Sequence, residues 1–386
     1  MKFASRLDRF GQDIFTILDE KRIAVGQSGK KIYNLSIGTP DFETPDYVKE
    51  ALKKAADEPD AWKYPLHDLP ELKEALCSYY KRRFGVELAH DEMMSTSGTQ
   101  TGLGYIFLTC CNPGDVVLLP DPCYPGFEAA AYLTDCSINY YPLLEENDFV
   151  PELDSIDDDI AKKAKLIIVN FPSNPTGAIA DDSFYEKLIT WAKKNDVLVV
   201  FDNAYTDIVF DGNEGKSFLS YEGAKDVGVE CFSLAKSFNV TGAGISFLTG
   251  RRDVIEAVRL LREHVNFGMF IPLQRAAIAA LTKEDGDLEK QCAIYEERRN
   301  VFCKGLRDIG LKMTDVRGGM FVWVQIPERF HDSMEFCFEL LENAGVLCTP
   351  GSGFGPHGEG YVRFALVMDK EELKGAVEAI RRSGLI

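Results

Sequence analysis

The chain has 386 residues, of which 45% are apolar, and its formal net charge is −18. This length is sufficient for two domains, and the apolar fraction is typical of a globular protein. The negative charge disfavours nucleic acid and acidic membranes as partners, because both attract an excess of lysine and arginine.

The start of the chain shows no export signal and no membrane signal. Residues 1–15 lack the apolar core of a signal peptide, and no apolar run approaches the roughly 18 residues that span a bilayer. Ten cysteines are scattered without a C-x-x-C pair, so we expect reduced thiols, no disulfides and no metal site. These features favour a cytoplasmic enzyme.

The middle of the chain alternates short apolar runs with longer amphipathic stretches. Residues 182–195 predict a helix, because their apolar side chains recur every three to four residues. Alternating strands and helices predict a mostly parallel sheet with helices on both faces. Buried strands are predicted at residues 115–120, 165–170, 197–202 and 229–233.

The rhythm changes after about residue 285. A long charged helix is predicted over 287–307, followed by strands at 319–325 and 361–365 and a final helix containing Leu373 and Ile380. We therefore expect a smaller C-terminal α+β domain, with the N-terminal segment packing on it. The expected division is 1–40 for that segment, 41–285 for the large domain and 286–386 for the small domain.

Polar residues collect where three of the predicted strands end. Residues 170–177 (Asn-Phe-Pro-Ser-Asn-Pro-Thr-Gly) follow one strand, 202–205 (Asp-Asn-Ala-Tyr) the next, and 233–236 (Ser-Leu-Ala-Lys) a third. Each motif alone has an ordinary explanation, such as a turn, a helix cap or a solvated lysine. In open α/β sheets, however, ligands bind at the carboxyl ends of the strands. The conjunction of the three motifs therefore predicts a binding site.

With these motifs the chain resembles the class I/II aminotransferases, pyridoxal-phosphate (PLP) enzymes of fold type I. The resemblance extends over nearly the whole chain, including residues 35–41, 112–125, 350–355 and 360–364. It implies an α/β large domain with a mostly parallel seven-stranded sheet between helices, and a smaller α+β domain. Residues 79–88 and 267–275 resemble bacterial aspartate-type and LL-diaminopimelate-type members.

The resemblance also implies roles around the coenzyme ring. Lys236 would form the internal aldimine and then move the proton between the substrate α-carbon and the coenzyme. Asp202 would face the pyridine nitrogen and favour its protonated, electron-withdrawing form. Tyr205 and Asn174 would hydrogen-bond the phenolate oxygen, and Tyr124 would stack on the ring.

Further residues are implied at the coenzyme phosphate and at the partner subunit. Ser97, Gly98 and Thr99 open a predicted helix whose backbone N–H groups would bind the phosphate, and Ser233 would add a contact. Tyr64 resembles a tyrosine that reaches the phosphate from the other subunit. The resemblance therefore implies a homodimer with shared active sites.

The substrates implied are an L-amino acid and a 2-oxo acid. Arg363 resembles the arginine whose donor fork binds the substrate α-carboxylate. Gly38 and Asn174 would lie beside the same carboxylate.

Two positions depart from the family pattern. Most relatives have a phosphate-binding arginine eight residues after the Schiff-base lysine, where this chain has Gly244. Loss of one charge-assisted hydrogen bond should weaken coenzyme binding by roughly 10- to 200-fold. Arg251 is about 23 Å away along an extended strand, so it is not expected to substitute. Backbone N–H groups of Gly242 and Gly244, or a residue of the partner subunit, stay open as substitutes. The turn after Tyr64 also lacks the usual glycine.

The leading hypothesis is an aminotransferase of amino acid metabolism that works by a ping-pong mechanism. Another PLP reaction on the same scaffold, by a β-lyase, decarboxylase, synthase or oxidase, stays open because the same lysine, aspartate and tyrosine serve all of these. A catalytically silent PLP-binding protein is the third alternative, and Gly244 is the argument for it.

Overall fold

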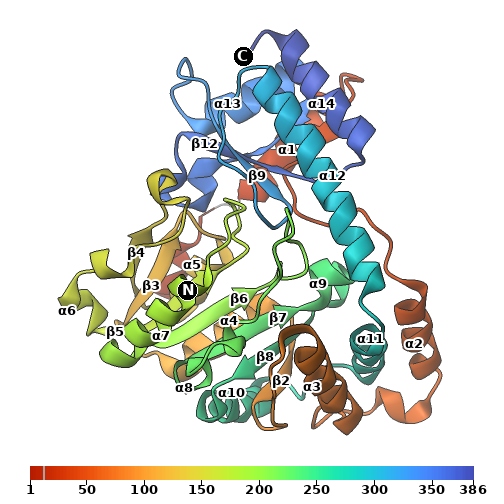
Figure 1. Cartoon of the computed structure of the whole chain (residues 1–386), viewed down its shortest axis with the longest axis vertical. Coiled ribbons are helices and arrows are strands. Elements are labelled where there is room, and N and C mark those ends of the chain that lie inside the picture. Colours follow the sequence, from red (N-terminus) through yellow and green to blue (C-terminus); the bar gives the residue numbers. More distant parts are fainter. Residues whose placement is uncertain (12–13) are drawn as a thin grey trace.

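A seven-stranded sheet forms the centre of the larger part of the molecule, in a computed structural model that describes residues 1–11 and 14–386 (Figure 1). The strand order is β2-β8-β7-β6-β5-β3-β4, and every pairing is parallel except those of β8 with β2 and β7. The predicted fold class is confirmed. The strands are β2 (Met93–Ser97), β3 (Val116–Asp121), β4 (Ser137–Pro142), β5 (Ala164–Asn170), β6 (Leu198–Asn203), β7 (Gly228–Ser233) and β8 (Ile245–Gly250).

Helices cover both faces of this sheet because successive side chains of a strand point to opposite faces. In β5, Leu166 and Ile168 pack with α4 (Thr99–Cys110), α5 (Gly126–Leu133) and α10 (Arg252–Val265). The alternate residues Ile167 and Val169 belong to a second core, formed with α3 (Pro70–Phe84), α7 (Asp182–Asn195) and α11 (Ile271–Thr282). The continuous apolar runs of the sequence are therefore strands buried on both sides.

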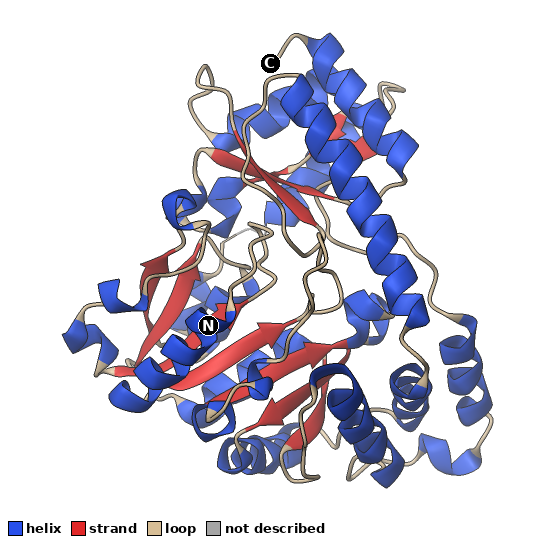
Figure 2. Ribbon diagram, viewed as in Figure 1, coloured by secondary structure: helices blue, strands red, loops and turns tan. Residues whose placement is uncertain are grey.

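The smaller part contains a three-stranded antiparallel sheet in the order β11-β12-β9 (Figure 2). Its strands are β9 (Phe321–Gln325), β11 (Thr349–Pro350) and β12 (Tyr361–Ala365), with helices α13 (Ser333–Glu339) and α14 (Lys370–Ser383). The long helix α12 (Gly286–Asp308) runs from beside α11 up to this part (Figure 1). Its Leu288 belongs to the core of the larger part, whereas Tyr295 and Phe302 belong to that of the smaller part.

The N-terminal segment contacts both parts. Arg6 and Arg9, in the 3-10 helix η1 (Ser5–Arg9), donate to the carbonyls of Leu133 and Cys136 in the larger part. Helix α1 (Ile14–Gly26) packs through Leu18 on the smaller part, and β1 (Tyr33–Asn34) pairs parallel with β10 (Val346–Leu347). The described residues of this segment therefore lie against both parts of the molecule.

The remaining elements are short or peripheral. Helix α2 (Asp46–Ala56) packs on α11, and α6 (Asp158–Ala161), α8 (Ala224–Val227) and α9 (Leu234–Ser237) are single turns. A π-helical turn, η7, covers Leu340–Ala344. The other 3-10 turns are η2 (Pro59–Trp62), η3 (Glu145–Asn147), η4 (Leu153–Ser155), η5 (Phe218–Ser220), η6 (Thr241–Ala243), η8 (Gly351–Phe354) and η9 (Pro356–Gly358).

Sequence patterns predicted the parallel strands better than the edges of the sheet. The four predicted strands correspond to β3, β5, β6 and β7, and the helix predicted over 182–195 is α7. The edge strand β4 was not predicted, and neither were β2 and β8, because Ser and Thr interrupt their apolar runs. Their polar side chains have partners inside the fold, such as the bond from Thr249 to Tyr80.

Two further findings concern the sequence-based exclusions. In the ranges 1–11 and 14–386, no helix is both long enough and apolar enough to cross a membrane. All ten cysteines are free thiols.

Candidate active site

A cavity of about 630 Å³ lies at the carboxyl ends of β5, β6 and β7 and is closed by residues of β9 and β12. The three polar motifs predicted from the sequence meet here, because parallel neighbouring strands end at one edge of the sheet. The lining residues include Phe15, Ile37, Gly38, Ser97, Gly98, Thr99, Tyr124, Asn170, Asn174, Asp202, Tyr205, Ser233, Lys236, Gly244, Ser246, Phe321 and Arg363.

Lys236 lies on the single helical turn α9 that follows β7. Ser233 begins this turn, and its hydroxyl accepts the backbone N–H of Ala235. The Lys236 Nζ donates to the carbonyl oxygen of Gly38, from the N-terminal segment. Burial, helped by the positive charge of Arg363, lowers the pKa of Lys236 to about 8. The neutral, nucleophilic form of this amine is therefore more populated near neutral pH than that of an ordinary lysine.

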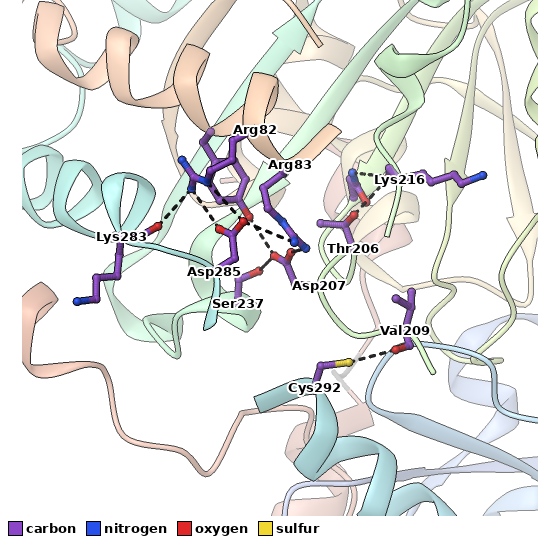
Figure 3. A network of polar contacts seen from close by, with 12 residues as sticks. Arg82, Arg83, Thr206, Asp207, Val209, Lys216, Ser237, Lys283, Asp285 and Cys292 are labelled. Carbon is purple, nitrogen blue, oxygen red and sulfur yellow. Dashed lines mark hydrogen bonds and ion pairs between the residues drawn. The ribbon is translucent and has the colours of Figure 1, made fainter. Parts of the chain in front are cut away.

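A buried network of hydrogen bonds anchors the helical turn that carries Lys236 (Figure 3). The Ser237 hydroxyl donates to Asp207 Oδ2 at 2.5 Å, and Arg83 Nη2 donates to Asp207 Oδ1 at 2.7 Å. Tyr79 donates to the same carboxylate at 3.2 Å. Because these side chains come from α3, α9 and the segment after β6, they fix the turn against the sheet. No pattern in the sequence indicated this support.

Asp202 is the last but one residue of β6 and has an unsatisfied acceptor. Its Oδ1 is buried without a hydrogen-bond partner among the described residues. Burial raises the pKa of Asp202 from an ordinary value of 3.8 to about 7. The Asn170 side chain donates to the Asp202 backbone carbonyl at 2.8 Å and so aligns the ends of β5 and β6. A ligand with an N–H donor would satisfy the free carboxylate oxygen.

Tyr205 and Tyr124 complete the walls around Asp202. Burial raises the pKa of Tyr205, and the neighbouring Asp202 adds to the effect, so its hydroxyl stays protonated as a donor. The Tyr124 ring lies against Gly126, where a Cβ atom would be 2.4 Å from the ring. Glycine at residue 126 therefore leaves the space that this ring occupies.

Arg363 comes from β12 of the smaller part and is only 2% exposed. Its Nη1 donates to Asn174 Oδ1 at 2.8 Å, and its Nη2 donates to the Ser36 carbonyl at 2.6 Å. The guanidinium also stacks on Phe321, with 4.1 Å from Cζ to the ring centroid. Burial lowers the pKa of Arg363 to about 10. This leaves a fixed cation inside the cavity, suited to a carboxylate ligand.

Gly38 has a steric reason to be glycine. A Cβ atom at this position would be 2.4 Å from the Phe321 ring. The close approach brings the Gly38 carbonyl to Lys236 and the N-terminal segment to the cavity.

Three hydroxyl groups meet at the start of α4, and we refer to Thr99, Ser233 and Ser246 as the hydroxyl cluster. Ser246 Oγ donates to Ser233 Oγ at 3.2 Å and lies 3.3 Å from Thr99 Oγ1. Gly98 precedes the helix with a φ of 92°, a conformation that favours glycine. The helix start offers backbone N–H groups, so an anion can bind between it and the cluster.

Tyr64 is the one predicted site residue that does not line this chain's cavity in the described structure. It is 76% exposed, and its ring packs on Phe267 with 4.6 Å between centroids. Gly244 does line the cavity, with a φ of 60°. A Cβ atom there would lie 3.5 Å from the Ser97 carbonyl carbon, so the position faces the start of α4.

Several cavity residues were not predicted from the sequence. Phe15 and Ile37 come from the N-terminal segment, and Phe321 from β9, where each resembles an ordinary apolar residue. Ser246 had a weak signal, as a small polar residue inside the apolar run Ile245–Leu248. Their proximity is a result of tertiary folding.

The donor set fits pyridoxal phosphate. The buried, unpaired Asp202 Oδ1 in the described structure suits a protonated ring nitrogen, and the Lys236 amine suits an aldehyde. The hydroxyl cluster and the start of α4 suit a phosphate.

Comparisons with known proteins agree over nearly the full length. Residues 30–380 match the family model described as aminotransferase class I and II. The chain is 37% identical over 387 residues to LL-diaminopimelate aminotransferase of Halothermothrix orenii, covering 100% of this chain and 99% of the relative. Identity to the same-named protein of Syntrophobacter fumaroxidans is 39% over 381 residues, covering 98% of each chain. The solved structure of substrate-bound BacF from Bacillus subtilis superposes with a TM-score of 0.95 at 36% identity, covering 99% of this chain and 98% of that one.

Proposed function

The chain belongs to the class I and II aminotransferase family and is a PLP-dependent aminotransferase, and from this premise we propose that the cavity around Lys236 is its active site. The observation that supports this proposal is the meeting of Lys236, Asp202 and Arg363 in one cavity. They are an amine with lowered pKa, a carboxylate with a free oxygen and a buried guanidinium.

Bound PLP withdraws electrons from the substrate α-carbon, and the surrounding side chains orient the reactants. Lys236 would hold the coenzyme covalently through its amine. The same amine, when free, would accept the proton of the substrate α-carbon and later donate it. The network of Asp207, Arg83 and Ser237 keeps this lysine in position.

Asp202 holds a proton on the coenzyme ring nitrogen with its otherwise unpaired Oδ1. Tyr205 donates its hydroxyl and Asn174 its amide to the coenzyme oxygen, and Tyr124 covers one face of the ring. Ser97, Gly98, Thr99 and Ser233 bind the phosphate. The burial of Asp202, Tyr205, Asn174 and Ser233 and the hydrogen bonds within the hydroxyl cluster support these roles.

Arg363 binds the α-carboxylate of the amino acid and of the 2-oxo acid, beside Gly38 and Asn174. Both substrates therefore use the same anchor in turn, as a ping-pong mechanism requires. The guanidinium is 2% exposed and lies against Phe321, so it attracts a carboxylate more strongly than it would in water.

We further propose a homodimer in which Tyr64 enters the partner's active site. Trp62, Tyr64, Phe267 and Phe270 form an exposed aromatic patch, with rings 4.6 and 5.2 Å apart in contacting pairs. Contiguous exposed apolar side chains mark interaction surfaces. We also propose that residues 41–285 and 286–386 form two domains and that the protein is cytoplasmic.

The names of the relatives make LL-diaminopimelate the first candidate amino donor. One observation favours a second candidate, an amino acid with an apolar side chain. The wall near Arg363 includes Phe15, with its ring 5.7 Å from the guanidinium, and the 42% exposed Ile37. Neither side chain can form a hydrogen bond or an ion pair with a second charged group on the substrate.

A donor panel tests the function and separates the two candidates. The protein loaded with PLP is mixed with LL-diaminopimelate, aspartate, phenylalanine or leucine, with 2-oxoglutarate or pyruvate as acceptor. An aminotransferase turns over only when an oxo acid is present, whereas a lyase or decarboxylase does not need one. Turnover without the acceptor would contradict the proposed reaction.

A further inference from the structure

The phosphate end of the cavity has no arginine from the described part of the chain. Among the described residues that line the cavity, the cationic side chains are Lys236 and Arg363. Lys236 Nζ bonds the Gly38 carbonyl, and Arg363 bonds Asn174 and Ser36. Gly244 faces the start of α4 but has no side chain to offer. The phosphate therefore needs other donors.

Ser246 lies two residues after Gly244, on β8, and lines the same cavity. A Cβ atom at residue 244 would lie 3.5 Å from the Ser97 carbonyl carbon, and the Ser246 hydroxyl lies 3.3 Å from that of Thr99, so both positions face the start of α4. Ser246 is 1% exposed, which is unusual for a serine without a ligand or a strong partner.

Its hydrogen bonds within the protein are long. The oxygen–oxygen distances are 3.2 Å to Ser233 and 3.3 Å to Thr99, whereas hydroxyl–hydroxyl bonds are usually about 2.7–2.8 Å. The three hydroxyls come from separate elements: the end of β7, the start of α4 and the start of β8. They can therefore turn toward an anion placed between them at little cost.

We infer that Ser246 is a phosphate ligand of the coenzyme and, with Thr99 and Ser233, takes the place of the arginine absent at Gly244. The inference rests on the proposed placement of PLP in this cavity. In the described chain, uncharged hydroxyls and backbone N–H groups then recognise the phosphate at this end. Binding should therefore depend less on salt than binding by an arginine does.

The test compares PLP with pyridoxal, which has the same ring and aldehyde but no phosphate. Each is titrated into the cofactor-free protein and followed by absorbance. For Ser246→Ala we expect the dissociation constant for PLP to rise about 10- to 100-fold, the size of one charge-assisted hydrogen bond. The constant for pyridoxal should change less than about twofold by the same reasoning.

A matched control lies on the same strand. Thr249 is equally buried, but its hydroxyl bonds Tyr80 and it does not line the cavity among the described residues. Thr249→Val should leave the ratio of PLP to pyridoxal affinity unchanged. Ser246→Thr keeps the hydroxyl and should restore most of the PLP affinity.

Three results would overturn the inference: an unchanged PLP affinity in Ser246→Ala, an equal loss for PLP and pyridoxal, or a shift of the same ratio in Thr249→Val. The placement of PLP is checked separately by borohydride reduction and mass spectrometry of the wild-type protein. A label on another residue than Lys236 would contradict the proposed site. A label on Lys236 with an unchanged Ser246→Ala affinity would contradict only the role of Ser246.

Discussion

A hydrogen bond of 2.8 Å joins Arg363 Nη1 to Asn174 Oδ1, across the boundary between β12 and the loop after β5. Arg363 is proposed to bind the substrate carboxylate, and Asn174 is proposed to contact both the coenzyme and that carboxylate. Because both side chains are buried, any change to one alters the orientation of the other. Substrate binding and coenzyme binding therefore share a contact.

Arg363→Lys should raise KM for both the amino donor and the oxo acid by roughly 100-fold, because a lysine cannot form the two parallel hydrogen bonds. The dissociation constant for PLP should rise much less than KM, because Arg363 is not expected at the phosphate or the ring and acts on the coenzyme only through its hydrogen bond to Asn174. Steady-state kinetics and PLP titration measure the two effects. Arg329→Lys, on the exposed surface, is the control. An unchanged KM would exclude Arg363 as the carboxylate ligand.

The rate at which Lys236 reacts with PLP should increase with pH to a plateau, with the midpoint of the increase near pH 8. The pKa of Lys236 is lowered to about 8, and only the neutral amine attacks an aldehyde. In Arg363→Leu the nearby positive charge is lost, so the pKa of Lys236 should rise and the midpoint should move to higher pH. Stopped-flow absorbance measures the reaction rate of both proteins from about pH 6 to about pH 10, close to the ordinary pKa of lysine. A midpoint that does not move would contradict the coupling.

Asp202 should make the cofactor-free protein less stable as pH rises. Its pKa is about 7 in the folded chain and 3.8 ordinarily, so the folded state binds this proton more tightly. The resulting stability is fully present below about pH 4 and is lost as pH rises through 7. At 1.36 kcal/mol per pKa unit, the maximum change is on the order of 4 kcal/mol.

Urea unfolding of the cofactor-free wild type and of Asp202→Asn at pH 5 and 8 tests this. The wild type should lose more stability than the variant between these two values. With PLP bound, the wild type should instead be the more stable of the two proteins at pH 8, because the amide of Asp202→Asn cannot hold the proton on the ring nitrogen. Equal pH dependence in both cofactor-free proteins would show that the carboxylate is not desolvated as the structure indicates.

Gly244→Arg should tighten PLP binding and destabilise the protein without PLP. The new cation would lie beside the start of α4, where a Cβ atom has ordinary contacts of 3.5 Å or more. Its φ of 60° costs a non-glycine residue about 1–2 kcal/mol in the folded state. We expect roughly tenfold tighter PLP binding that weakens with salt. Thermal unfolding and titrations at two salt concentrations separate the effects; unchanged affinity would be contrary to this account.

Phe267→Glu should convert the proposed dimer into a monomer, because it places a charge in the exposed aromatic patch of Trp62, Tyr64, Phe267 and Phe270. Ile294→Glu, at an exposed apolar residue of α12, is the control. Light scattering measures the mass, and PLP titration should show weaker binding in the monomer if Tyr64 acts across the interface. A wild-type mass equal to one chain would refute the dimer.

The sequence by itself was sufficient to predict the parallel strands β3, β5, β6 and β7 and the polar residues at the carboxyl ends of three of them. Continuous apolar runs identify strands buried on both faces, and the polar residue that ends each run marks the carboxyl edge. Asn170, Asp202 and Ser233 could therefore be located by local pattern alone, and the resemblance to a known family added Lys236 and Arg363.

Only the tertiary structure decided which distant residues complete the site. Phe15 and Ile37 line the cavity because the N-terminal segment packs beside it, and Phe321 does so because β9 of the smaller part lies against it. No local periodicity encodes these contacts. The support of Lys236 by Asp207 and Arg83 likewise joins three elements far apart in sequence.

At Gly244, too, the sequence and the tertiary structure supply different information. The sequence identified a missing cation, but a single position cannot reveal which neighbour replaces it. Ser246 emerged once β8 was seen to pair antiparallel with β7, which sets its hydroxyl 3.2 Å from Ser233. Local sequence determines which residues are buried and which are polar, whereas strand order and register determine which of them meet.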